Sequence, residues 1–109
     1  MKRWDVSFTD EAKKDYDALG SAAQNQVAKA IRKVSQNPLP QSEGGYGKPL
    51  GHKHGKNLTG LLKIKLKKLG IRVVYRLMRT DEIMKIVVVA ARGDDEVYTV
   101  AAKRMHKRV

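Results

Sequence analysis

Several features are missing from this 109-residue chain, and each absence excludes a class of protein. Cysteine is absent, which excludes disulfides, thiolate metal sites and cysteine nucleophiles, and fits a reducing compartment. The longest apolar run, residues 86–91, covers six residues, where a membrane helix needs about 20. Asp5 stands where a signal peptide would begin its apolar stretch. We therefore expect one cytoplasmic domain over residues 1–109, without membrane contact.

Acidic residues are missing from one long segment. Residues 48–80 hold ten Lys and Arg and no Asp or Glu, so this segment carries most of the net charge of +12. A surface that serves only solubility usually mixes charges of both signs. A concentrated positive field attracts polyanions, either nucleic acid or an acidic protein. We therefore expect residues 48–80 to contribute a surface that binds a polyanion.

The hydropathy pattern predicts the element order β-α-α-β-β-β-α. Alternation over residues 3–8 is typical of a strand, and Thr9 is a candidate N-cap for the helix that follows. Ser21 and Gln24 match a capping box at the start of a second helix, which Asn37-Pro38 ends. The remaining segments are a loop over 37–60, strands over 61–67, 71–78 and 83–91, and a helix over 96–107.

This order predicts an α+β fold in which an N-terminal strand and a helical hairpin pack on a mainly antiparallel sheet, with a C-terminal helix. If Leu69-Gly70 is a two-residue turn, the two strands beside it form a hairpin. The turn then predicts three facing pairs: Lys63 with Arg76, Lys65 with Val74, and Lys67 with Arg72.

These pairs place five cations on one sheet face. Like charges that face each other across strands destabilise a sheet, so a structural role alone does not explain them. A bound polyphosphate would neutralise them. Neighbouring positive charges also favour the neutral form of a lysine amine, which suits a general base. We therefore expect this face to bind a phosphate-containing ligand.

The segment LLKIKLKKLGIRVVYRL, followed by VVVAARGDDEVYTVAAKR, resembles the RelE branch of the RelE/ParE toxin superfamily. These proteins are the toxin halves of bacterial type II toxin–antitoxin systems. The resemblance covers nearly the whole chain and includes the motifs K-x-K, G-x-R-x-V-Y and R-x-x-x-E-V-Y in that order. It implies a metal-independent endoribonuclease, without a cofactor, that cuts mRNA in the ribosomal A site through attack by a ribose 2′-hydroxyl.

The resemblance also implies roles for five residues. Lys65 would accept the 2′-hydroxyl proton, with Lys63 beside it as the other lysine of the K-x-K motif. Arg72 would stabilise the phosphorane, Arg92 the leaving 5′-oxygen, and Tyr98 would stack on or orient the scissile nucleotide. Further contacts with RNA or the ribosome are expected from Lys53, Lys56, Lys67, Lys68, Arg76, Lys103 and Arg104.

Asp94 and Asp95 depart from the family pattern, and they either cap the last helix or weaken RNA affinity. His52 and His54 have no carboxylate near them in the sequence, so no metal site is expected. The implied partners are a cognate antitoxin with an acidic segment, mRNA, the ribosome with its rRNA, and operator DNA for the toxin–antitoxin complex. Two alternatives stay open: a ParE-like toxin that inhibits gyrase, and a non-catalytic nucleic-acid-binding or autoregulatory module.

Overall fold

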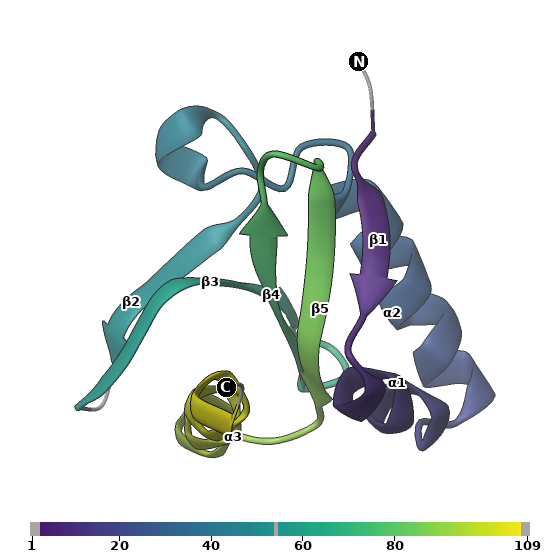
Figure 1. Ribbon diagram of the computed structural model, residues 1–109. Helices are drawn as coiled ribbons and strands as arrows, with labels where there is room; N and C mark the ends of the chain where they lie inside the picture. The colour runs from purple at the N-terminus through teal and green to yellow at the C-terminus, as the bar shows by residue number, and fades with distance from the viewer. Residues whose placement is uncertain (1–2, 54, 108–109) are drawn as a thin grey trace.

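The computed structural model describes residues 3–53 and 55–107. Its elements are β1 (Asp5–Phe8), α1 (Asp10–Asp17), α2 (Ser21–Val34), the 3-10 helix η1 (Gln41–Glu43), β2 (Lys48–Lys53), β3 (Lys56–Leu66), β4 (Ile71–Met78), β5 (Ile83–Ala90) and α3 (Asp94–Lys107). The five strands form one sheet in the order β1-β5-β4-β3-β2 (Figure 1). Strand β1 pairs parallel with β5, and the other neighbours pair antiparallel. The predicted α+β fold with a mainly antiparallel sheet is therefore confirmed.

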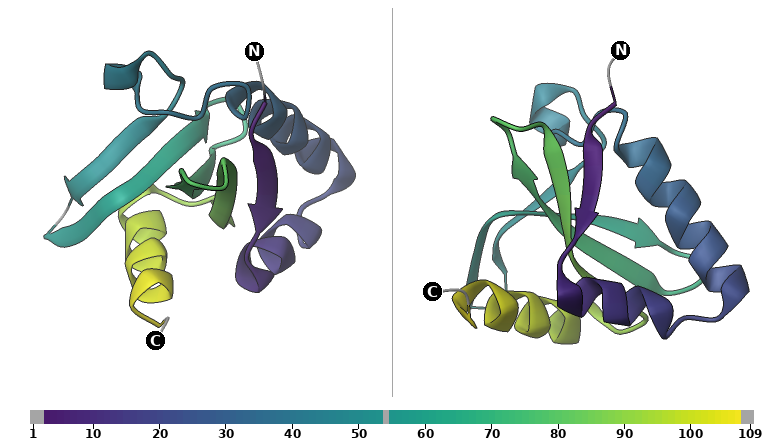
Figure 2. Two further views of the ribbon diagram at one scale, coloured as in Figure 1. Left: turned by 45° about the horizontal axis from the view of Figure 1, so that its top comes forward. Right: turned by 45° about the vertical axis from the view of Figure 1, so that its right-hand side comes forward.

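Helices cover both faces of the sheet, with α1 and α2 on one side and α3 on the other (Figures 1 and 2). The alternating apolar residues of β4 explain the first layer. Val73 and Tyr75 point to the side of α1 and α2, where they pack with Val27 and Ile31 of α2.

Among the described residues, none of the helices has the length and the apolar character that a membrane span requires.

The second apolar layer lies beneath α3. Val97 and Ala101 of α3 pack against Leu61 of β3 and Val74 of β4, which are fully or almost fully buried. These two strand residues share their face with the predicted cations, because side chains alternate along a strand. The face that carries the cations therefore also contributes apolar side chains to the second core layer, and α3 covers the centre of this face.

The helix starts follow the sequence in one case and depart from it in the other. The hydroxyl of Thr9 accepts a hydrogen bond of 3.1 Å from the backbone N–H of Ala12, so the predicted cap of α1 is confirmed. The predicted capping box of α2 is wrong, because the N-cap is Gly20 and Ser21 is already helical. The side chain of Gln24 instead donates to the carbonyl of Tyr16, which ties α2 to α1.

The predicted loop over residues 37–60 is wrong for its second half, which forms β2 and the start of β3. Glycines interrupt the alternating pattern of these strands, since Gly51 and Gly60 have φ values of +56° and +92°. The pairing of the two strands is also irregular between Pro49 and Gly51, which breaks the alternation.

The β3–β4 hairpin is real, but its predicted register is wrong by two residues. The connection is the four-residue turn 67–70, in which the N–H of Leu69 bonds to the carbonyl of Leu66. The facing pairs are therefore Lys65 with Arg72, Lys63 with Val74, and Leu61 with Arg76. A shift by an even number keeps the paired side chains of both strands on their predicted faces. Lys67, predicted to be the fifth cation of that face and to lie opposite Arg72, instead lies in the turn. Lys63, Lys65 and Arg72 consequently still share one face.

Candidate active site

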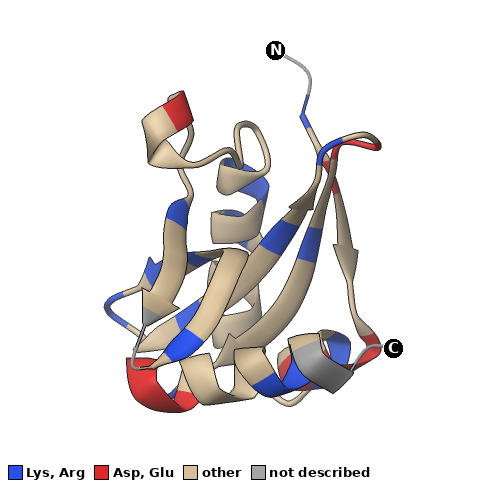
Figure 3. Cartoon of the chain, turned by 60° about the vertical axis from the view of Figure 1, so that its left-hand side comes forward, with Lys and Arg blue, Asp and Glu red and all other residues tan. Residues whose placement is uncertain are grey.

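Cationic side chains from β3 and β4 meet the first turn of α3 at one end of the sheet. Lys63 and Lys65 point to the same face of β3, and Lys65 lies directly across the ladder from Arg72 of β4. Figure 3 shows blue, basic segments of the strands close to the red, acidic start of α3. Lys63, Lys65 and Arg72 are called the cation cluster below.

Asp94, the first residue of α3, lies within the cation cluster. Its Oδ1 accepts a hydrogen bond from Nε of Arg72 and lies 3.9 Å from Nζ of Lys63. Burial by itself would raise the pKa of Asp94. The hydrogen bond from Arg72 and the charges of Lys63, Arg72 and Lys65 outweigh it and hold that pKa below its ordinary value. Asp94 is therefore an anion at neutral pH and neutralises part of the cluster.

The guanidinium of Arg72 is held by the backbone as well as by Asp94. Its Nη1 donates to the carbonyl oxygens of Gly70 at 3.2 Å and of Arg92 at 2.6 Å. The side chain is 14% exposed. A charged group fixed in this way needs little rearrangement to stabilise charge that develops next to it.

Lys63 and Tyr98 form the inner part of the site. Nζ of Lys63 donates a 2.7 Å hydrogen bond to the hydroxyl oxygen of Tyr98 and lies 5.4 Å from the centre of its ring. Tyr98 is 2% exposed, because it belongs to the face of α3 that packs on the sheet in the second apolar layer. The structure therefore brings these two predicted residues together. A base could stack on the ring of Tyr98 only after the ring becomes more exposed.

Lys65 and Arg92 form the outer part of the site, and both side chains are exposed. Arg92 lies in the bend between β5 and α3, and its Nη1 is 3.6 Å from a carboxylate oxygen of Glu96, one helical turn further on. All five residues with predicted catalytic roles thus lie at the same end of the sheet, two of them partly covered and two open to solvent, with Tyr98 buried.

The residues predicted to contact RNA or the ribosome are more dispersed. Lys67, Lys68 and Lys103 are exposed, and Arg76 lies further along β4, opposite Lys85. Arg104 has a structural role, since it donates to the carboxylate of Asp15 at 2.7 Å and to the carbonyl of Val87 at 2.8 Å. The half-buried Lys56 begins β3, and the side chain of Lys53 lies outside the described part.

Potential metal ligands do not gather in the described part of the chain, where no three His, Cys, Asp or Glu side chains lie together. His52 is exposed on β2, and His54 lies outside the described residues.

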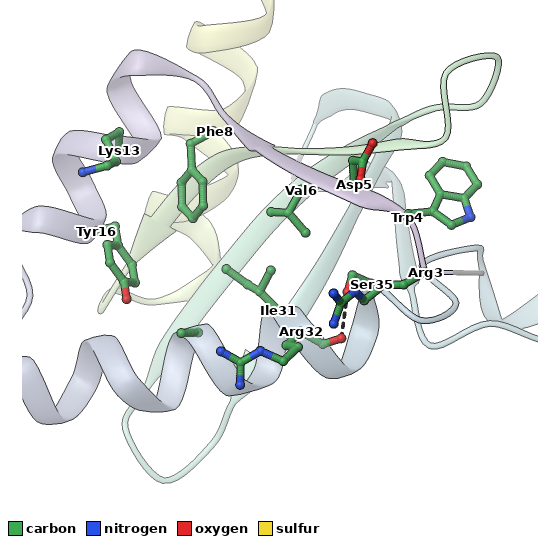
Figure 4. A pocket seen from close by; sticks show the side chains of 11 residues that line it. Arg3, Trp4, Asp5, Val6, Phe8, Lys13, Tyr16, Ile31, Arg32 and Ser35 are labelled. Atoms are coloured by element: carbon green, nitrogen blue, oxygen red, sulfur yellow. Dashed lines mark hydrogen bonds between the residues drawn. The ribbon is translucent and has the colours of Figure 1, made fainter. Parts of the chain in front are cut away.

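A separate groove of about 400 Å³ lies between β1 and α2, on the side of the sheet away from α3. Figure 4 shows its apolar side chains Phe8, Ile31 and Tyr16, with the charged Lys13 and Arg32 nearby. None of the predicted site residues that the structure describes lines this groove. The cation cluster and the groove are therefore distinct surfaces.

Asp94 is the site residue whose contacts were not foreseen from the sequence. The sequence offered one signal, the acidic pair Asp94-Asp95 beside the predicted site, which departs from the family pattern. That signal predicted either a helix cap or weaker RNA affinity, and it gave no partner for the carboxylate. The pairing with Arg72 depends on the position of α3 over β4, which no local pattern specifies.

Comparisons with known proteins give a consistent result. The sequence model of one family, described as the ParE toxin of type II toxin–antitoxin systems, matches residues 6–96. A RelE-like toxin protein of Escherichia coli is 32% identical over 103 residues, which cover 94% of this chain and 98% of the relative. The mRNA interferase toxin RelE of E. coli K12 is 28% identical over 100 residues, covering 92% and 95%.

Solved structures of toxins with related names also resemble the fold. A free-state variant of E. coli toxin RelE superposes with a TM-score of 0.74 at 25% identity and covers 95% of this chain and 99% of its own. The toxin–antitoxin complex RelBE2 of Mycobacterium tuberculosis gives a TM-score of 0.68 at 25% identity, with coverage of 86% and 97%.

Proposed function

Because the chain belongs to the RelE/ParE superfamily and is the toxin of a RelBE-type toxin–antitoxin system, we propose that it is a ribosome-dependent mRNA endonuclease that inhibits translation. The observation that carries the proposal is Lys65 lying across the ladder from Arg72, with Lys63 on the same face. A relative with 28% identity is named an mRNA interferase, which supports the same kind of activity.

In the proposed reaction, a ribose 2′-oxygen attacks the adjacent phosphorus while the bond from phosphorus to the 5′-oxygen breaks. Lys65, as the neutral amine, accepts the 2′-hydroxyl proton, and Arg72 stabilises the negative charge of the phosphorane. Arginine is a poor proton donor, so Arg92 stabilises charge on the leaving 5′-oxygen, which takes its proton from water. The products are a 2′,3′-cyclic phosphate and a 5′-hydroxyl. No residue in this scheme requires a metal ion or an organic cofactor.

Lys63 and Tyr98 have supporting roles in the proposal. Their mutual hydrogen bond fixes the ammonium of Lys63 beside the phosphate position, and Tyr98 orients the scissile nucleotide once α3 allows access to its ring. Lys67, Lys68 and Lys103 are exposed and suit contacts with the phosphates of mRNA or rRNA, which contribute affinity without sequence specificity.

The proposed protein partner is a cognate antitoxin whose acidic segment complements residues 48–80. The solved relatives include toxin–antitoxin complexes, which supports a partner of this kind. A segment rich in Asp and Glu would compete with RNA for the same cations, since both are polyanions. We also propose that the toxin–antitoxin complex binds operator DNA, and that the toxin acts in the cytoplasm, where its mRNA substrate is translated.

The experiment that tests this function maps 5′ ends by primer extension on an mRNA incubated with the purified protein, with and without translating ribosomes. The key variant is Lys65→Ala. Its matched control is Arg32→Ala, which removes one charge from the distant groove side of the sheet. We expect codon-spaced cuts that require ribosomes, disappear in Lys65→Ala and persist in Arg32→Ala.

Cuts on naked RNA would support the nuclease activity but contradict its dependence on the ribosome. Absence of cuts under both conditions would overturn the proposed activity. The second candidate would then be a gyrase inhibitor of the same fold, which the match to the ParE family model favours. A DNA supercoiling assay with purified gyrase would detect it. A binding or autoregulatory module would be inactive in both assays.

A further inference from the structure

The carboxylate of Asp94 lies in the cation cluster, where it accepts a hydrogen bond from Arg72, and we propose that it competes there with the phosphodiester of a polynucleotide. Asp94 is, in this view, an internal substitute for the substrate's phosphate in the free protein. The inference rests on the proposed function, because it names what controls access to the same site. It adds a residue for which the proposed reaction has no use.

The contacts of Asp94 are those that a phosphate would need. Nε of Arg72 carries a single hydrogen, and Oδ1 of Asp94 already accepts it. The same oxygen lies 3.9 Å from Nζ of Lys63. Carboxylate and phosphate oxygens are interchangeable acceptors for a guanidinium, so a phosphate that binds Nε of Arg72 has to displace Asp94.

The alternative role for Asp94 is to hold Arg72 in place, and the contacts of Arg72 argue against it. Nη1 already donates to two backbone carbonyl oxygens, those of Gly70 and Arg92. These bonds fix the plane of the guanidinium without Asp94. What Asp94 contributes beyond them is a negative charge at the point where the substrate's charge would lie.

The balance of charge indicates which ligands can displace Asp94. One carboxylate faces the three charges of Lys63, Lys65 and Arg72, so the cluster keeps a positive excess. Asp94 is 35% exposed, against 14% for Arg72, so its carboxylate can move towards solvent. A strand with several phosphates binds many cations at once and can drive this exchange, whereas a single small anion lacks the additional contacts. The arrangement therefore favours polynucleotides over free phosphate.

The test compares three forms of the full-length chain: wild type, Asp94→Asn and Asp95→Asn. The control is matched, because Asp95 is the next residue of the same helical turn and its replacement removes the same charge. The probe is a short, fluorescently labelled single-stranded DNA, which lacks the 2′-hydroxyl and so stays intact. Fluorescence anisotropy measures its dissociation constant over a range of salt concentrations, and circular dichroism checks the fold of each form.

We expect Asp94→Asn to lower the dissociation constant about tenfold, as the loss of a competing charged hydrogen bond implies. Asp95→Asn should change it by less than about twofold, because Asp95 is exposed and its charge is screened by water and salt. Equal gains in both variants would assign the effect to net charge and overturn the proposal. Weaker binding by Asp94→Asn would make Asp94 a support for Arg72 and also overturn it.

Cleavage is measured separately on RNA, which keeps this inference distinct from the proposed function. If Asp94→Asn binds DNA about tenfold more tightly while no form cuts RNA, the competition is supported and the nuclease assignment fails. If the wild type cuts RNA but Asp94→Asn binds DNA no more tightly than Asp95→Asn, the competition fails and the nuclease assignment stands.

Discussion

At the scale of single residues, Tyr75 shows how one polar atom is accommodated in the core. Its side chain is fully buried, and its hydroxyl donates a 2.8 Å hydrogen bond to the carbonyl of Pro38. Burial raises the pKa of Tyr75, so the hydroxyl stays neutral. The apolar alternation of β4 predicted a core position for this tyrosine. No local pattern indicated that its hydroxyl fixes the chain after α2, since that contact spans 37 residues.

Replacement of Tyr75 by Phe should lower the free energy of unfolding by about 1–2 kcal/mol, because it leaves the buried carbonyl of Pro38 without its donor. Urea denaturation followed by circular dichroism measures this change. Tyr46→Phe is the matched control, since Tyr46 is 49% exposed and should change stability by less than about 0.5 kcal/mol. Equal losses in the two variants would contradict the role assigned to the hydrogen bond.

The ion pair of Asp94 predicts a pH dependence at the same scale. The pKa of this carboxyl is lowered in the folded state, so its contribution to stability is complete above its ordinary value of 3.8. That contribution is lost as the pH falls through the lowered pKa, when the carboxylate takes up a proton. The stability difference between the wild type and Asp94→Asn should therefore shrink in acid. Urea midpoints of both forms at neutral and acidic pH measure it, and a constant difference would contradict the pairing.

At the scale of elements, α3 is the part of the chain whose attachment matters most to the site. The helix contributes Asp94 and Tyr98 to the site. Arg104 anchors its last turns to Asp15 of α1 and to the backbone of β5. The carboxylate of Asp15 also accepts the backbone N–H of Val89, so one acid joins α1, β5 and α3.

Arg104→Ala should therefore loosen α3 without unfolding the sheet. We expect backbone amides of α3 to exchange with solvent about ten times faster, because the helix loses a charged hydrogen bond at its C-terminal end. Hydrogen exchange followed by NMR resolves this change residue by residue. Lys103→Ala, at the neighbouring exposed position, should leave the exchange rates of α3 within about twofold of the wild type. Equal acceleration in both variants would show that the anchor lies elsewhere.

The elements also show which parts of the fold a sequence can predict. Long alternating or helical patterns indicated β4, β5, α2 and α3 correctly, because burial on one face makes apolar residues recur at a regular spacing in the sequence. The strands β2 and early β3 were missed, since glycines with positive φ values interrupt their pattern. The hairpin register was wrong because Leu69-Gly70 matches a two-residue turn, while the chain uses four residues there. Turn length depends on the whole sheet, and a dipeptide carries little of that information.

At the scale of the whole molecule, the concentration of positive charge in residues 48–80 predicts salt-dependent binding. If Lys63, Lys65 and Arg72 each neutralise one phosphate, a plot of log affinity against log salt for single-stranded RNA should have a slope of about −2. Removal of one of them by Lys65→Ala should reduce the slope by about 0.7. Titrations at several salt concentrations test both values. A slope that Lys65→Ala leaves unchanged would place the bound strand elsewhere.

The sequence predicted this cationic surface correctly in part, although the strand pairing on which the prediction rested was wrong. Clustering of charge along the chain indicated a polyanion site, and the alternation of β3 placed Lys63 and Lys65 on one face. The shift in register changed their partners and left the face intact. Neither pattern could predict that α3 would cover the centre of the face and insert Asp94, because packing across the sheet has no local signature in the sequence.

The parallel pairing of β1 with β5 has a consequence for the order in which this chain can assemble. The side chains of Ser7 and Lys85 are hydrogen-bonded across a separation of 78 residues. During synthesis, β1 leaves the ribosome first and has no strand to join until β5 has followed it. Contacts of such long range also form slowly, because a large loop has to close before they add stability. The sheet can therefore be completed only after β5 has left the ribosome.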